Sequence, residues 1–189
     1  MKVFDNVSYG GNERNVLDLY IPEKDTATVF IYIHGGGFEE GSQKDKDVVN
    51  MAKALAKKGI AVVCPTYRLY PDAKYPEFIE DGACAVKWVF ENMDKYITAE
   101  KIFVGGQSAG AYITQNLCFN DKYLRKHGIT NEMIAGYFHD AGQPTTHFNV
   151  LNERGIDSDR VIIDDAAPLY YIDGKSYYPP MEFVVAAND

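Results

Sequence analysis

Short apolar runs alternate with amphipathic segments along most of the chain, and this alternation limits the folds open to it. A β-branched and aromatic run at 28–33, too short for a helix, predicts a buried strand. Helical spacing follows at 47–58 and ends at Gly59, and the next buried strand is predicted at 60–64. Buried strands separated by helices favour a mainly parallel sheet with helices on both faces. The expected class is therefore α/β.

The same alternation continues towards the end of the chain. The remaining predicted elements are two short strands within the first twenty residues, a helix opened by Pro76, a strand at 101–105, a helix at 109–119, and strands at 133–138 and 181–187. The stretch from about 143 to 178 differs, because it is polar and rich in Asp, Tyr and Pro. We expect it to be an insertion, part helix and part loop, that forms a lid. The length of residues 1–189 suits a single domain.

Charge and cysteine content narrow the possible partners and compartments. The 189 residues include 27 acidic and 19 basic side chains, for a net charge of −8, which argues against binding to nucleic acid. The N-terminus has no signal-peptide pattern, and no apolar run is long enough for a membrane span. Cys64, Cys84 and Cys118 form no C-x-x-C pair and lie in apolar stretches. We expect buried free thiols in a cytoplasmic protein, and a cysteine nucleophile is the weaker alternative.

A G-x-S-x-G pattern, formed by Gly106, Ser108 and Gly110, lies between the predicted strand at 101–105 and the predicted helix at 109–119. A strained turn there would lift the Ser108 hydroxyl above the sheet, and small residues on either side let strand and helix approach. The N-terminus of the helix beneath favours a developing negative charge. Ser108 is therefore the predicted nucleophile. The alternative is a glycine-rich turn with an incidental serine.

Three glycines follow the strand at 28–33, in the sequence His34-Gly35-Gly36-Gly37-Phe38. Acyl transfer passes through a tetrahedral oxyanion, and backbone N–H groups in a glycine loop can bind it closely. We assign the N–H groups of Gly36, Gly37 and Ala109 as its donors. We expect His34 to fix the loop by hydrogen bonds to the backbone, and a catalytic role for it is the alternative. Neither glycine loop spells G-x-G-x-x-G, so we expect no dinucleotide, other cofactor or metal.

In these motifs the sequence resembles the hormone-sensitive-lipase-like carboxylesterases and related bacterial esterases of the α/β-hydrolase superfamily. The resemblance rests on the two glycine motifs and on the stretches Leu17–Pro22, Tyr67–Leu69 and Ala166–Tyr170. It implies an α/β-hydrolase fold and a serine carboxylic ester hydrolase that forms an acyl-enzyme on Ser108. It also implies a small-molecule partner, namely an ester with a small or medium acyl group.

The acid and the base of a catalytic triad should follow the nucleophile in the order acid, then histidine. The resemblance places the acid at Asp189, just after the predicted strand at 181–187. The four histidines, His34, His127, His139 and His147, all precede it. His139 or His147 could act as the base only by breaking this order. We therefore expect the histidine to lie beyond Asp189, and the last strand and closing helix of the fold to be missing from these residues.

Two other functions stay open beside the ester hydrolase. One is an amide hydrolase of the arylformamidase type, which would share the glycine loop and the serine turn. The other is a binding or interaction protein that lacks the catalytic histidine. Glu39 and Glu40 follow the glycine loop, so we also expect the site to disfavour anionic substrates by charge repulsion.

Overall fold

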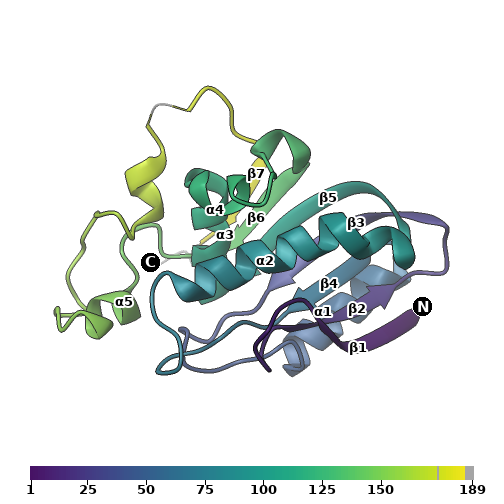
Figure 1. The fold of residues 1–189 in the computed structure, drawn as a ribbon, viewed down its shortest axis with the longest axis horizontal. Helices are drawn as coiled ribbons and strands as arrows, with labels where there is room; N and C mark the ends of the chain where they lie inside the picture. The colour runs from purple at the N-terminus through teal and green to yellow at the C-terminus, as the bar shows by residue number, and fades with distance from the viewer. Residues whose placement is uncertain (174, 186–189) are drawn as a thin grey trace.

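The computed structural model describes residues 1–173 and 175–185, which build a seven-stranded sheet with the order β1-β2-β4-β3-β5-β6-β7 (Figure 1). The strands are β1 (Lys2–Ser8), β2 (Val16–Ile21), β3 (Thr26–Ile33), β4 (Ala61–Pro65), β5 (Thr98–Gln107), β6 (Gly136–Asp140) and β7 (Met181–Val184). β1 pairs with β2, and β2 with β4, in antiparallel fashion. All other pairs are parallel, which confirms the predicted mainly parallel sheet.

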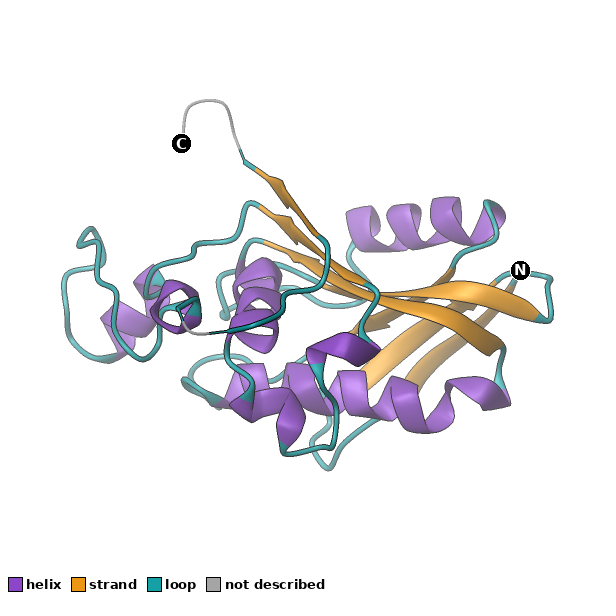
Figure 2. Ribbon diagram, turned by 90° about the horizontal axis from the view of Figure 1, so that it is seen from above, coloured by secondary structure: helices purple, strands orange, loops and turns teal. Residues whose placement is uncertain are grey.

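Helices cover both faces of the sheet, as predicted (Figure 2). The α-helices are α1 (Lys46–Lys57), α2 (Glu77–Asn92), α3 (Ala109–Phe119), α4 (Lys122–Arg125) and α5 (Phe148–Glu153), and short 3-10 segments lie at Met93–Lys95, Asn131–Met133 and Pro168–Tyr171. α1 lies on one face, and α2 and α3 lie on the other (Figure 2). α2 and α3 each return the chain from the edge where one parallel strand ends to the opposite edge, where the next one begins.

Burial along the strands follows this division. On β3, Val29, Ile31 and Ile33 are fully buried in the cluster that includes α2 and α3. On β4 both faces are buried, because α1 packs on Val62 and Cys64 from the opposite side. The alternating burial along β3 and the unbroken burial along β4 therefore reflect one fully covered face and two covered faces, respectively.

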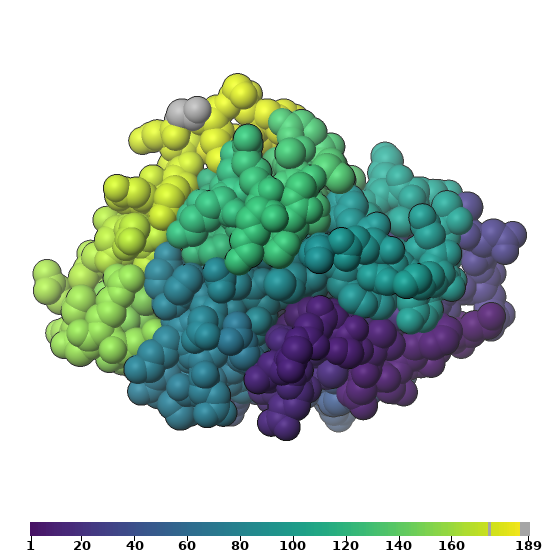
Figure 3. Space-filling view, in the orientation of Figure 1, coloured from purple at the N-terminus to yellow at the C-terminus, as the bar shows by residue number. Residues whose placement is uncertain are grey.

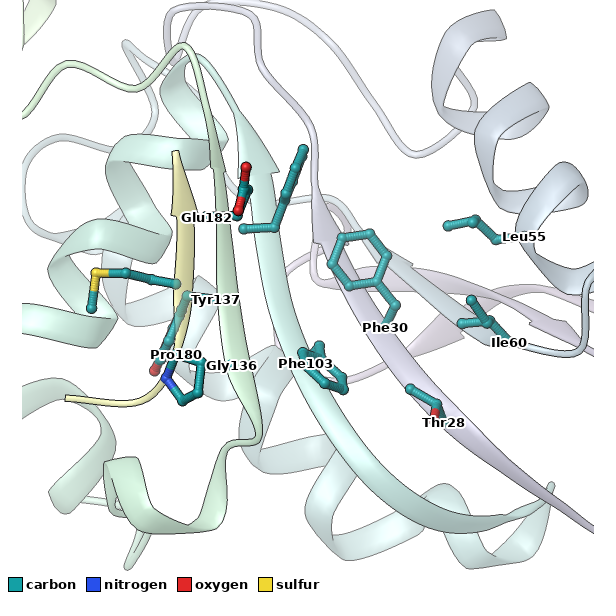
Figure 4. Close-up of a pocket in the computed structure, with 11 residues that line it drawn as sticks. Thr28, Phe30, Leu55, Ile60, Phe103, Gly136, Tyr137, Pro180 and Glu182 are labelled. Atoms are coloured by element: carbon teal, nitrogen blue, oxygen red, sulfur yellow. The ribbon is translucent and has the colours of Figure 1, made fainter. Parts of the chain in front are cut away.

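An apolar groove of about 500 Å³ lies on the face of α1 and crosses the sheet beyond it (Figure 4). Leu55 and Ile60 stand at one side of the groove, and Pro180 and Glu182 stand at the other. Phe30 and Phe103 lie on its floor and are only half-buried. Among the helices that the structure describes, Figure 2 shows α1 alone on this face.

Some element bounds differ from the prediction. The strand expected to begin at Met133 begins at Gly136, because 131–133 forms a 3-10 turn in which Ile134 N–H donates to Asn131 O (3.2 Å). The strand expected at 181–187 ends at Val184, and residues 186–189 lie outside the described ranges. The prediction for 109–119 matches α3.

The stretch 143–178 contains α5, a 3-10 segment and loops, and it gathers at one end of the molecule (Figures 1 and 3). Its role as a lid and the single-domain boundary stay predictions. The three cysteines form no disulfide; Cys64 and Cys118 are buried, and Cys84 is half-buried rather than buried. Within the described ranges, no helix has the length and apolar character needed to cross a bilayer.

Candidate active site

Ser108 occupies the turn between β5 and α3 in a strained backbone conformation, with φ +51° and ψ −118°. Residues other than glycine rarely adopt positive φ, so the surrounding structure must hold this one in place. Its N–H donates to Asp140 O at the end of β6 (2.7 Å), and its carbonyl accepts from Tyr112 N in α3 (2.9 Å). The turn is thus tied to a neighbouring strand and to the helix that follows. The predicted strained turn is present, and the Ser108 side chain is partly exposed.

The flanking glycines are required by close packing. A Cβ on Gly110 would lie 2.1 Å from Ile33 O, and one on Gly106 would lie 2.6 Å from the carbonyl carbon of Gly110. Neither position can hold a side chain without moving backbone, since Cβ contacts below 3.0 Å do not occur. The G-x-S-x-G spacing therefore reflects the approach of α3 to the end of β3.

The glycine loop after β3 lies beside the serine turn. A Cβ on Gly35 would lie 3.2 Å from Ser108 Cβ and 3.1 Å from Gln107 O. Gly36 and Gly37 have φ values of +109° and +61°, which glycine adopts at little cost. The structure therefore brings the predicted nucleophile and the predicted donor loop together.

Hydrogen bonds to the loop carbonyls determine where its N–H groups point. Gly35 O accepts from His34 Nδ1 (2.6 Å) and Tyr67 Oη (3.3 Å), and Gly36 O accepts from the N–H groups of Glu39 and Glu40 (both 3.0 Å). In a trans peptide the N–H points opposite to the preceding C=O. The N–H groups of residues 36 and 37 are therefore directed away from these bonds, and neither has an acceptor within the described ranges.

Ala109 supplies the third predicted donor. It is the first residue of α3, so its N–H has no acceptor within the helix. The N-terminal end of the helix also carries a partial positive charge. None of the three N–H groups assigned from the sequence thus has an acceptor among the described residues.

His34 makes the backbone hydrogen bond that the sequence suggested. Besides Gly35 O, its ring contacts Thr66 Oγ1 through Nε2 (3.0 Å) and stacks on Tyr67 with ring centroids 4.4 Å apart. Burial lowers the pKa of His34 to about 4, so the ring is neutral at pH 7. Both nitrogens are engaged in holding the loop, which leaves none to take a proton from Ser108.

The other histidines are also engaged elsewhere. His139 on β6 is fully buried; its Nδ1 contacts Thr114 Oγ1 (2.9 Å) and its Nε2 has no partner within the described ranges. His147 Nδ1 accepts from the N–H of Asn149 and caps α5. Burial lowers the pKa of both rings to about 4. His127 lies half-buried near Cys84 (3.9 Å). No hydrogen bond joins any of these rings to Ser108.

The predicted acid, Asp189, lies outside the described residues. The structure does describe β7, the strand before Asp189, and the position of β7 shows which edge of the sheet it leads to. β7 runs parallel to β6, and Val184 O accepts from the N–H of Ala141, the residue after Asp140. The end of β7 is therefore at the same edge of the sheet as the strand end that holds Ser108 N–H.

Two contacts at the site were not predicted from the sequence. Asn149 of α5 donates through Nδ2 to Gly37 O, which docks the 143–178 stretch on the glycine loop. Arg14 donates to Gly41 O (2.8 Å), Tyr67 O (2.8 Å) and Thr66 Oγ1 (3.0 Å). Neither residue lies in a motif, so only the tertiary structure shows its contact with the loop.

A cavity of about 350 Å³ adjoins the glycine loop and Gln107, the residue before Ser108. Its acidic lining residues are Glu40, Asp45 and Asp47. The space beside the site therefore has negative side chains at its wall.

Comparison with known proteins identifies a matching family and similar esterases. The family model described as BD-FAE matches residues 17–122. A rice (Oryza sativa subsp. japonica) protein described as a probable isoprenylcysteine α-carbonyl methylesterase is 35% identical over 115 residues, covering 59% of this chain and 27% of the relative. An acetyl esterase of Salmonella schwarzengrund is 33% identical over 111 residues, covering 57% of this chain and 34% of the relative.

Among solved structures, an esterase of Pyrobaculum calidifontis matches with a TM-score of 0.71 and 25% identity. The match covers 96% of this chain and 65% of that one. Nearly the whole of this chain therefore shares its fold with an esterase. The chain spans less than two thirds of the length of this esterase and of the two relatives above.

Proposed function

The chain belongs to the BD-FAE family of α/β-hydrolases, and on that basis we propose that it is a serine carboxylic ester hydrolase with Ser108 as nucleophile. One observation carries the proposal. The strained Ser108 turn lies against a glycine loop whose N–H groups at 36 and 37 are directed away from its own hydrogen bonds. Together with Ala109 N–H, they fit the oxyanion of an acyl-transfer intermediate.

The proposed reaction has two halves. Ser108 Oγ attacks the ester carbonyl carbon while a general base takes its proton, and the carbonyl oxygen becomes the oxyanion. The C–O bond to the alcohol then breaks, and the alcohol leaves with the proton, which gives an acyl-enzyme on Ser108. Water attacks the acyl-enzyme in the same manner and releases the carboxylic acid and free Ser108.

For the acid we propose Asp189, supported by the register of β7 at the Ser108 edge of the sheet. The histidine base is not assigned to His34, His139 or His147, because none of these rings hydrogen-bonds to Ser108. The experiment must therefore distinguish an ester hydrolase from a binding protein that lacks a catalytic base.

We propose esters with a small or medium acyl group as substrates, and the acetyl esterase relative, named for a small acyl group, supports this. For the compartment we propose the cytoplasm. The support is that none of the three cysteines is in a disulfide, as expected where thiols stay reduced.

The test combines labelling with hydrolysis. The protein is expressed from its full reading frame, treated with a fluorophosphonate and assayed on p-nitrophenyl acetate, alongside Ser108→Ala and the exposed control Ser176→Ala. We expect labelling at Ser108 and ester hydrolysis in the parent and the control, and neither in Ser108→Ala. A folded parent that takes no label would favour the binding protein. Preference for an aryl formamide over the ester would favour the amide hydrolase.

A further inference from the structure

Arg14 lies between β1 and β2, outside the matched family region at 17–122, yet it contacts the exit of the glycine loop and the segment after β4. Its Nη2 donates to Gly41 O (2.8 Å), where the loop leaves the site, and to Thr66 Oγ1 (3.0 Å). Its Nε donates to Tyr67 O (2.8 Å). One guanidinium thus joins the loop to the segment after β4.

The contact with Thr66 fixes the direction of a chain of hydrogen bonds. A guanidinium can only donate, so Thr66 Oγ1 accepts from Arg14, and its own proton is free to go to His34 Nε2 (3.0 Å). Gly35 O can only accept, so the proton of the neutral ring is on Nδ1, which donates to it (2.6 Å). The hydrogen bonds therefore all run in one direction. Arg14 donates to Thr66, Thr66 donates to His34, and His34 donates to Gly35 O.

The last bond of this chain bears on the oxyanion donors. Holding Gly35 O to the histidine ring turns the N–H of Gly36 to the opposite side of the peptide. Without the hydrogen bonds from Arg14 and Thr66, the His34 ring could place its proton on Nε2 instead. Gly35 O would then lose this donor. The peptide before Gly36 would then have one fewer bond holding its orientation.

We propose that Arg14 is a positioning residue that, through Thr66, sets the Nδ1–H tautomer of His34 and thereby orients the Gly36 N–H towards the oxyanion. The proposal rests on the proposed function for its catalytic consequence. Its structural part, the tautomer, stands apart from any activity.

The kinetic experiment uses Arg14→Met, which keeps length and removes the donors, and Thr66→Val, which keeps shape and removes the hydroxyl. Thr66→Ser restores the hydroxyl, and Arg125→Met is a control on α4, where Arg125 forms an exposed ion pair with Asp121, away from the glycine loop. We expect kcat per fluorophosphonate-titrated Ser108 to fall by about 10- to 100-fold in Arg14→Met and Thr66→Val, with KM changed by less than about threefold. Thr66→Ser and Arg125→Met should retain parent values.

A merely structural role would lower the melting temperature or the titrated fraction and leave kcat per titrated site unchanged, and that result would overturn the proposal. The second measurement is ¹H–¹⁵N correlation of the His34 ring at pH 7 in the parent chain and in Thr66→Val. We expect the Nδ1–H tautomer in the parent and a changed Nε2 resonance in the variant. An Nε2–H tautomer in the parent would overturn the proposal even if no ester is hydrolysed, whereas lack of hydrolysis with the Nδ1–H tautomer present would count against the proposed function alone.

Discussion

The edge of the sheet that carries Ser108 and the open face that carries Phe103 are stabilised in different ways. At the edge, hydrogen bonds fix the loop carbonyls, and glycines occupy positions where a Cβ would meet backbone. On the open face, aromatic side chains line a groove of about 500 Å³ that the described residues leave uncovered (Figure 4). Hydrogen bonds require defined directions, whereas apolar burial requires only a covering surface. The serine turn and the glycine loop are therefore held by contacts among the described residues, whereas those residues cover the open face only in part.

The largest expected effect comes from adding a side chain at a glycine of the Ser108 edge. Gly110→Val would place Cβ 2.1 Å from Ile33 O, and only movement of α3 away from β3 relieves the clash. We expect a loss of more than about 4 kcal/mol in unfolding free energy, or no folded protein at all. Urea unfolding followed by circular dichroism measures it. Gly11→Ala is the matched control, because nothing lies within 4 Å of its added Cβ, and a similar loss there would contradict the packing argument.

Acid should weaken the edge through its buried histidines. Burial lowers the pKa values of His34, His139 and His147 to about 4 from the usual 6.5. Between these values the unfolded chain binds more protons than the folded one. Stability is therefore complete above pH 6.5 and is lost as pH falls towards 4, by roughly 3 kcal/mol for each histidine.

The measurement is the unfolding free energy between pH 7 and 4. His147→Asn keeps a side-chain acceptor at the start of α5 and should make the slope shallower. The half-buried His127 is the comparison, and His127→Asn should change the slope less. An unchanged slope in His147→Asn would contradict the assignment of the pH dependence to that ring.

The sequence predicts the parts of the site that depend on local patterns, and it does not predict those that depend on long-range contacts. Ser108 and the glycine loop were predictable because each lies in a local pattern, a strand followed at once by a turn. Arg14 and Asn149 were not, because they contact the loop across 27 and 112 residues of sequence. The late start of β6 has a local cause, since a 3-10 turn satisfies the backbone there and apolar spacing does not report such a turn.

Neighbouring residues on opposite sides of the sheet test the open face. Ile31 is fully buried against the α2 and α3 side, so Ile31→Ala should cost about 2–5 kcal/mol. Phe103 lies half-buried in the groove, so Phe103→Ala should cost only about 1 kcal/mol despite its larger side chain. Thermal unfolding of both variants at several protein concentrations checks this. Equal losses would mean that Phe103 is covered in solution.

The smallest effect concerns charge beside the site. Glu39 and Glu40 are exposed after the glycine loop, and Glu40 lines the adjoining cavity with Asp45 and Asp47. A substrate that carries a carboxylate would meet this negative wall, so Glu40→Gln should raise kcat/KM for an anionic ester relative to a neutral one. Exposed charges interact weakly across water, which limits the change to about two- to fivefold and makes it smaller in high salt. Glu39 does not line the cavity, so Glu39→Gln should change the ratio less; equal effects, or none, would show that repulsion at the cavity wall does not select the substrate.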